Sequence, residues 1–258
     1  MNLFHFFSLV NTQARMALKA EASKFVLSYL WWVIEPLLFV LIYYLVFEVL
    51  LGRGRDDFLL FLICGKIPYL WFQKGVVSAS NSIVQNKGLI NQVEMPKALF
   101  PYASVQEAMY KQWVVFLVLF GVVTFYGFRP ELNWLWLAPV VIVQYALILA
   151  CSLLGALCVS FYGDFRMVIN MGMLFLMFSS GLFWDVNDIA DPATRDLLFA
   201  CNPLAFLIDA YRQVLMGRTV YDLEHMAVLA GVIAVALLIM HIVLHKMSRI
   251  IAARVVNS

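Results

Sequence analysis

Six apolar stretches alternate with short polar segments along the chain. They cover residues 29–51, 58–84, 99–126, 134–162, 167–184 and 225–245. A transmembrane helix needs about 20 mostly apolar residues to cross a hydrocarbon core of about 30 Å. The pattern therefore predicts an all-α integral membrane protein with six transmembrane helices, five of them within residues 29–184, in a single transmembrane domain over residues 1–258.

Residues 1–28 precede the first span and are predicted to form an amphipathic helix lying in the membrane surface. Apolar side chains recur there at helical spacing, at Leu3, Phe7, Val10, Ala14 and Ala17. A signal peptide is not predicted, because the segment lacks a basic start and its apolar run breaks at Asn11.

Residues 185–224 carry two helix-start signals. Asp191-Pro192 and Asn202-Pro203 each pair a capping side chain with proline at the first helical position. An apolar face follows the second signal, at Leu204, Ile208, Tyr211 and Leu215. Gly217 is placed to end that helix. Because both helices are too short to cross and too apolar for a free loop, we expect short external re-entrant helices before the last span, with residues 225–258 forming that span and a cytoplasmic tail.

Composition supports the membrane class. Hydrophobic residues make up 64% of the chain and charged residues 13%, with a mean hydropathy of +0.87. Soluble domains carry about a quarter charged residues. A net charge of +2 indicates no nucleic-acid surface. No G-x-x-x-x-G-K-[ST] loop occurs, so no ATP site is predicted. His241 and His245 have a spacing that can bind metal, but no further ligands accompany them and no metal site is predicted.

Basic residues set the expected orientation, because cytoplasmic segments carry an excess of lysine and arginine. With the N-terminus inside, ten of the 18 basic residues face the cytoplasm and six face outward, while Lys66 and Lys74 lie within a span. Both termini are therefore predicted to be cytoplasmic.

Glu35 and Pro36 lie side by side near the start of the first span. If the span began after Glu35, Pro36 to Phe47 would give only about 18 Å of helix at roughly 1.5 Å per residue. The span therefore either buries Glu35 or is too short to cross. Three further charged residues lie in or near the first two spans: Glu48, Lys66 and Lys74. Intramembrane charges normally pair with one another or face water. They are predicted to pair between the spans, to line a hydrated path for a polar substrate, or both.

Aromatic residues are 15% of the chain. Trp31 and Trp32 lie near a span end, where an aromatic belt is usual. Deeper positions hold Tyr43, Tyr44, Phe175 and Phe178. Such side chains pack in helix bundles, and they would also suit a translocating sugar chain, whose apolar ring faces stack on aromatic rings. Composition leaves both interpretations open.

The layout resembles the permease subunits of ABC transporters that export O-antigen and capsular polysaccharides from Gram-negative bacteria. The stretches that carry the resemblance are LSYLWWVIEPLLFVLIYYLVF, NKGLINQVEMPKALFP, FYGDFR and NPLAFLIDAYRQVLMG, and it covers essentially the whole chain. It implies a homodimer in the bacterial inner membrane, paired with two copies of a separate ATPase subunit. ATP and magnesium would then bind to that partner, and this chain would bind no cofactor.

The resemblance also implies roles for particular residues. The connector after the second span would form a coupling helix docked in the ATPase, through Lys87, Gly88, Leu89, Ile90, Asn91, Gln92 and Glu94. Asp164 and Arg166 are a second candidate contact, although the family often has an arginine–aspartate pair there and here the basic residue follows the acid. In the external motif the corresponding residues are Asn202, Pro203, Tyr211 and Arg212.

Span one in this family lines the translocation path of the dimer. The expected gate or channel residues are therefore Trp31, Trp32, Glu35, Pro36, Tyr43, Tyr44, Lys66, Lys74, Phe175 and Phe178. Pro36 cannot donate to the Trp32 carbonyl, which makes the helix easy to bend. We expect Glu35 to face water or a lysine at a cytoplasmic gate.

Export of lipid-linked polysaccharide, with O-antigen favoured over capsule, is the leading interpretation. A drug or small-lipid exporter of the same class would have a narrower apolar cavity. A membrane enzyme acting on lipid-linked sugars would need clustered acids. One cluster is predicted on the outer side, but loop and helix-cap positions explain its four residues: Asp185, Asp188, Asp191 and Asp196. A proton-coupled secondary transporter usually has internal repeats, and none is evident here.

Overall fold

The computed structural model describes residues 3–23, 28–50, 52, 57–92, 95–217 and 219–257, and these ranges contain helices and no strand. The α-helices are α1 Leu3–Ala22, α2 Ser28–Tyr44, α3 Phe58–Gln85, α4 Lys87–Gln92, α5 Leu99–Phe125, α6 Leu137–Phe161, α7 Phe165–Ser179, α8 Pro192–Cys201, α9 Pro203–Arg212 and α10 Leu223–Asn257. Wider π-helical turns extend α2 over Leu45–Leu50 and α9 over Gln213–Gly217. Short 3-10 turns cover Leu132–Trp136 and Val186–Asp188.

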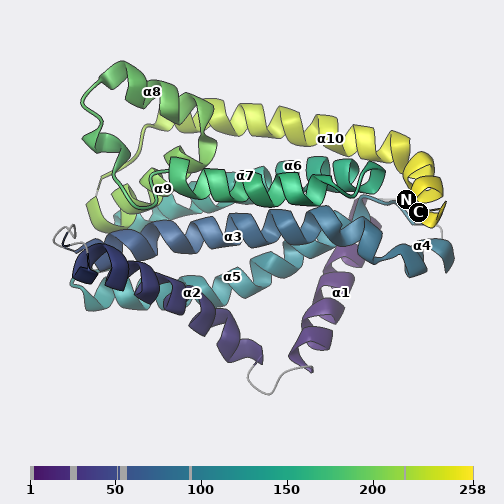
Figure 1. Cartoon of the computed structure of the whole chain (residues 1–258), viewed down its shortest axis with the longest axis horizontal. Helices are drawn as coiled ribbons and strands as arrows, with labels where there is room; N and C mark the ends of the chain where they lie inside the picture. The colour runs from purple at the N-terminus through teal and green to yellow at the C-terminus, as the bar shows by residue number, and fades with distance from the viewer. Residues whose placement is uncertain are drawn as a thin grey trace.

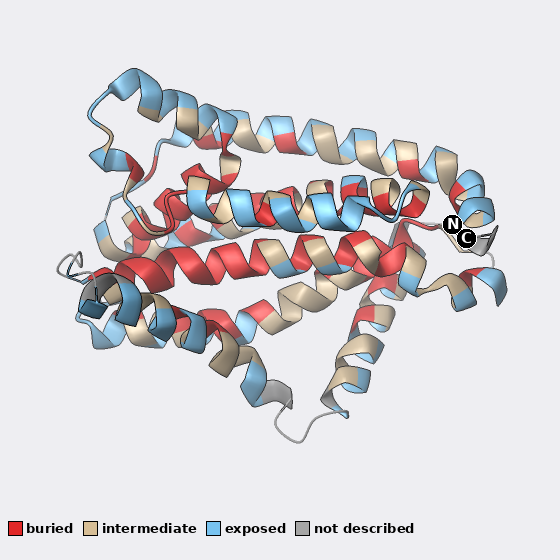
Figure 2. Cartoon of the chain, in the orientation of Figure 1, coloured by how far each residue is buried: buried red, intermediate tan, exposed pale blue. Residues whose placement is uncertain are grey.

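Helix α3 forms the centre of the bundle (Figure 1). It packs against both α5 and α6, and α6 packs in turn against α10. Figure 2 shows burial concentrated along α3 and exposure along α8 and α10. A helix buried on all sides is expected to be apolar nearly all round, and α3 fits that expectation apart from a few polar positions such as Lys66 and Lys74.

Among the residues that the structure describes, three helical segments are long and apolar enough to cross a membrane: Leu99–Phe125, Leu132–Phe161 and Leu223–Arg254. Shorter apolar helices cover Leu30–Tyr44 and Phe165–Ser179. The chain is thus an all-helical membrane protein, as predicted, whereas six crossings stay a prediction. Helix α7 ends at Ser179, earlier than the predicted residue 184, because Gly181 adopts φ 67° and turns the chain. Helix α10 runs past the predicted residue 245 to Asn257.

A helix is present at the predicted N-terminal position, as α1, whereas its place in the membrane surface stays a prediction. Its inner face buries Phe6, Val10 and Ala14, and the helix packs against α5. Phe4 and Phe7 are exposed on its outer side. Phe7 therefore belongs to a different face from the Val10 and Ala14 with which the sequence pattern grouped it.

The two ends of the bundle carry different elements. In Figure 1, α4 lies at the same end as the N-terminal end of α1 and the C-terminal end of α10, whereas α8 and α9 lie at the opposite end. Both predicted start signals are confirmed: Asp191 accepts from the amides of Ala193 and Thr194 at the start of α8, and Asn202 caps α9 in the same way. These bonds satisfy N–H groups that a helix start leaves without a partner.

Candidate functional site

An ion pair joins α2 to α3. The Lys74 ammonium lies 2.7 Å from a Glu35 carboxylate oxygen, with the two side chains 50% and 32% exposed. Glu35 was predicted to face water or a lysine, and the structure shows the lysine. Helix α2 runs without a break through Pro36, next to this pair. Since proline removes one backbone hydrogen bond, the ion pair lies where α2 is easiest to bend.

A second charged cluster lies beside the first, where the C-terminal end of α1 meets α5. Lys111 bonds to the Glu21 carboxylate and lies 2.8 Å from that of Glu107. The Trp32 indole donates to Glu21 at 3.2 Å, and its ring lies 5.6 Å from the Lys111 ammonium. Burial alone would raise the pKa of Glu21, but the hydrogen bond and charge of Lys111 outweigh it and lower the pKa.

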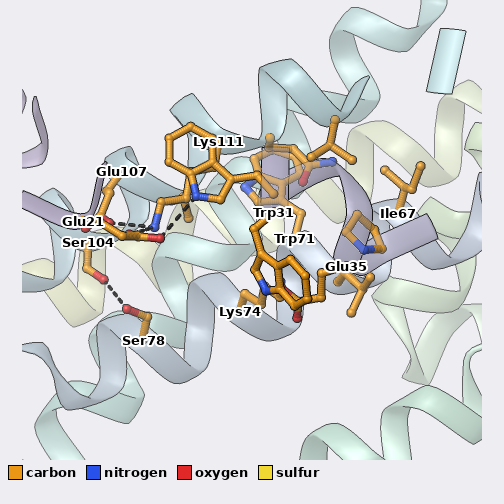
Figure 3. Close-up of a pocket in the computed structure, with 16 residues that line it drawn as sticks. Glu21, Trp31, Glu35, Ile67, Trp71, Lys74, Ser78, Ser104, Glu107 and Lys111 are labelled. Atoms are coloured by element: carbon orange, nitrogen blue, oxygen red, sulfur yellow. Dashed lines mark hydrogen bonds and ion pairs between the residues drawn. The ribbon is translucent and has the colours of Figure 1, made fainter. Parts of the chain in front are cut away.

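The two clusters share one cavity of about 230 Å³. Side chains from α1, α2, α3 and α5 line it, and Figure 3 shows Glu21, Trp31, Glu35, Trp71, Lys74 and Lys111 around it. Trp31, Trp32, Glu35, Pro36 and Lys74 of the predicted gate set are therefore brought together. Sequence reasoning did not assign roles here to Glu21, Glu107 and Lys111. Only the four-residue spacing of Glu107 and Lys111 on one helix could have indicated the second cluster.

Lys66 lies apart from this cavity and is 3% exposed. Its ammonium lies 4.9, 5.1 and 5.4 Å from the ring centres of Tyr43, Tyr69 and Phe39, and 3.4 Å from the Met177 sulfur. Lys66 was expected to pair with an acid. None of the acids whose side chains the structure describes pairs with it, so the expectation is wrong for those acids. Aromatic faces stabilise the charge there instead. The Glu48 side chain lies outside the described residues.

The deeper aromatic candidates separate into two groups. The ring centre of Phe183 lies 4.8 Å from that of Tyr43 on α2 and 5.6 Å from that of Phe178 on α7, so Phe183 joins the two helices. Tyr44 is partly buried against the core. Phe175 is 71% exposed on α7. The structure thus connects Tyr43 and Phe178 through a residue that the sequence did not indicate, and it leaves Phe175 on an outer face.

The external motif is tied to the rest of the bundle by Arg212. Its guanidinium donates to the carbonyls of Phe61, Gly181 and Leu182 at 3.3, 2.7 and 3.0 Å. It also lies 3.4 Å above the Phe61 ring centre.

Of the other motif residues, Asn202 and Tyr211 are buried and Pro203 is partly exposed. Asn202 donates to the Ser180 hydroxyl at 3.0 Å as well as capping α9. Pro203 occupies the first position of that helix, and Tyr211 packs against Phe116 with ring centres 6.1 Å apart. All four predicted residues of the motif therefore position α9.

The predicted coupling residues form the short helix α4. Ile90 is buried and α4 packs against α10, while Gly88, Asn91 and Gln92 are exposed. Lys87 and Leu89 are half-buried, and Glu94 lies outside the described residues. Asp164 and Arg166 are exposed at the start of α7. Within the described part of the chain no group of histidines, cysteines and acids could hold a metal ion. His241 lies instead within 3.2 Å of the Tyr102 hydroxyl.

Comparison with known proteins identifies relatives over most of the chain. The model of a family described as ABC-2 type transporter matches residues 26–216. O-antigen export system permease protein RfbA of Klebsiella pneumoniae is 26% identical over 229 residues, which cover 88% of this chain and 87% of the relative. The protein of the same name from Myxococcus xanthus is 27% identical over 237 residues, covering 91% and 90%.

Proposed function

The chain belongs to the ABC-2 type transporter family, and on that premise we propose that it is the membrane permease of an exporter that moves O-antigen, as a lipid-linked polysaccharide, across the bacterial inner membrane. The observation that carries the proposal is the name shared by its relatives. Two proteins from Klebsiella pneumoniae and one from Myxococcus xanthus, each matched over about nine-tenths of its length, are O-antigen export permeases.

In the proposed arrangement α2, α3, α5, α6, α7 and α10 cross the membrane, with both termini in the cytoplasm and α8 and α9 on the outer side. The start of α1, the end of α10 and helix α4 all lie at one end of the bundle, which supports this orientation (Figure 1). The exposed aromatic side chains of Phe4 and Phe7 suit a helix α1 that lies in the inner membrane surface.

The permease works as a homodimer with two copies of a separate ATPase, which binds ATP and magnesium, and makes no covalent bond itself. Helix α4 is the coupling helix, since it packs against α10 and presents Gly88, Asn91 and Gln92 outward. Asp164 and Arg166 form a second contact with the ATPase. An apolar stripe on α7 supports association with a second copy, through Met167, Val168, Met171, Leu174, Phe175 and Phe178, all exposed.

Replacing Glu35 with glutamine is expected to reduce export several-fold while the protein still folds. The ion pair with Lys74 is half-exposed, so it contributes only about 0–1 kcal/mol to the free energy of unfolding. Its loss at the bendable part of α2 would, however, change the balance between closed and open gate. Surface polymer and thermal stability of the purified variant are the measurements. Exchanging the charges, Glu35→Lys with Lys74→Glu, is the matched control that restores attraction, and normal export from a Glu35→Ala protein would contradict the gate role.

Depletion of this protein in its native host tests the proposed function. We expect polysaccharide to disappear from the cell surface and its lipid-linked form to accumulate inside, with both effects reversed by a plasmid-borne copy. Normal surface polymer after depletion would overturn the proposal and favour a small-molecule or lipid exporter. Loss of a capsule with O-antigen intact would show that the substrate is capsular polysaccharide and not O-antigen.

A further inference from the structure

Helix α10 has two opposite faces of different character. The face turned toward the bundle carries four buried apolar side chains: Met226, Ile233, Leu244 and Ile251. With 3.6 residues per turn, the opposite face holds a stripe of apolar side chains that are 42–62% exposed: Val228, Val232, Val235, Ile239 and Ile242. In a helix that crosses a membrane, such an exposed apolar stripe contacts lipid tails.

The same stripe becomes basic toward the end of α10. Lys246 follows Ile242 after four residues and Arg249 follows after three more, so both continue the exposed face, and both are exposed. Residues 225–258 contain no acidic side chain. Within the described part of the chain, neither Lys246 nor Arg249 pairs with an acid. Two positive charges therefore point outward in line with the lipid-facing side chains.

The depth of these charges can be placed along α10. Residues 225–245 contain no lysine, arginine, aspartate or glutamate, and at roughly 1.5 Å per residue their length matches a hydrocarbon core of about 30 Å. Lys246 and Arg249 then lie within about 6 Å of the edge of that core. This layer, about 5–7 Å thick on each side, holds the phospholipid headgroups.

We propose that Lys246 and Arg249 bind the phosphate group of an anionic phospholipid of the bilayer. An ammonium and a guanidinium both donate to phosphate oxygens. A lipid fits this face better than a protein partner, because the two charges lie at headgroup depth and Ile242 and Ile250 on the same face are 42% and 56% exposed. The inference goes beyond the proposed function, since it requires only that α10 crosses the membrane.

A bound lipid would also steady the part of α10 that holds α4. Ser248 lies between the two basic residues, and its hydroxyl accepts from the Lys97 backbone amide at 3.4 Å. Helix α10 packs against α4 over the same end of the bundle. The lipid composition of the membrane would therefore influence how firmly α4 is held.

The test uses the full chain in phosphatidylcholine nanodiscs that contain phosphatidylglycerol with a photoreactive group next to its headgroup. We expect labelling of the α10 peptide around residues 246–250. Lys246→Gln and Arg249→Gln should each weaken it about fivefold, the effect of one basic residue at an anionic membrane surface, whereas Lys246→Arg should retain it. Salt at about 1 M should weaken it too, because the screening length falls to about 3 Å. Arg195→Gln is the matched control, since it removes the same charge on α8 at the opposite end of the bundle.

Three results would overturn the proposal. Equal labelling of this peptide by photoreactive phosphatidylcholine would show contact with lipid tails and no recognition of negative charge. Labelling unchanged in both glutamine variants would show that phosphatidylglycerol binds elsewhere on α10. Loss of labelling when the ATPase is added would assign the basic face to that subunit. Export is not measured here, so lipid binding and the proposed function can fail independently.

Discussion

Replacing Asn91 with tryptophan is expected to abolish export while leaving the chain folded. Asn91 is exposed on α4, which packs against α10, and the neighbouring Ile90 is buried. An indole at position 91 therefore needs no space inside the permease. In a packed interface with the ATPase, an added bulky side chain costs about 1–3 kcal/mol, and each 1.4 kcal/mol, roughly, is tenfold in affinity. Association should weaken about tenfold or more.

Two measurements check this expectation: co-purification of the ATPase with the tagged permease, and polymer on the cell surface. Asp196→Trp is the matched control, because Asp196 is also exposed, with 72% of its side chain accessible, but lies on α8 at the far end of the bundle. Loss of both readouts with Asn91→Trp and of neither with Asp196→Trp is the expected result. An Asn91→Trp permease that retains its ATPase and exports normally would show that α4 is not the coupling helix.

Replacing Arg212 with leucine should have the largest effect on stability. Three backbone carbonyls, on α3 and in the turn after α7, would lose their charged donor. Gly65 leaves the guanidinium its space, since a Cβ there would lie 2.6 Å from the Arg212 Nη2 atom. A hydrogen bond to a charged group contributes about 1.5–3 kcal/mol, so we expect a loss of about 3 kcal/mol in the free energy of unfolding. That loss corresponds to a fall in Tm of about 6–12 °C for a chain of this size.

Thermal unfolding of the purified protein in nanodiscs measures this effect. Arg212→Lys should also destabilise the protein, because an ammonium cannot reach three separate carbonyls as the planar guanidinium does. Arg195→Leu is the matched control, since the ion pair that the described residues show for Arg195 on α8 joins it to the exposed Asp196 at 3.5 Å. Equal melting temperatures for Arg212→Leu and Arg195→Leu would disprove the role of Arg212 in holding α9 to the bundle.

Local sequence signals predicted most helix boundaries of this fold. The capping pairs at Asp191 and Asn202 marked the starts of α8 and α9 because their chemistry acts within three residues. The family resemblance, read from stretches spread along the chain, is confirmed by the family model. The end of α7 was missed because it depends on the backbone conformation of Gly181, which packing decides.

The site was predictable only where one partner implied another. Acids and lysines in neighbouring spans indicated that Glu35 could face a lysine, but they did not indicate that this lysine is Lys74. The contact between Glu21 and Lys111 was not predictable, because Glu21 lies on α1, 90 positions away along the chain, and only the fold brings it to α5. The same holds for Lys66, whose partners among the described side chains are aromatic rings from two helices.

ATP-driven movement of the polymer can be measured directly in proteoliposomes that contain the permease, its ATPase and the lipid-linked polysaccharide. With the ATPase facing outward, transport carries the polymer into the lumen, where added glycosidase cannot reach it. We expect ATP to protect the polymer with the wild-type permease and not with Asn91→Trp. Polymer that stays fully digestible while the wild-type complex hydrolyses ATP would contradict the conclusion that this chain forms the export path.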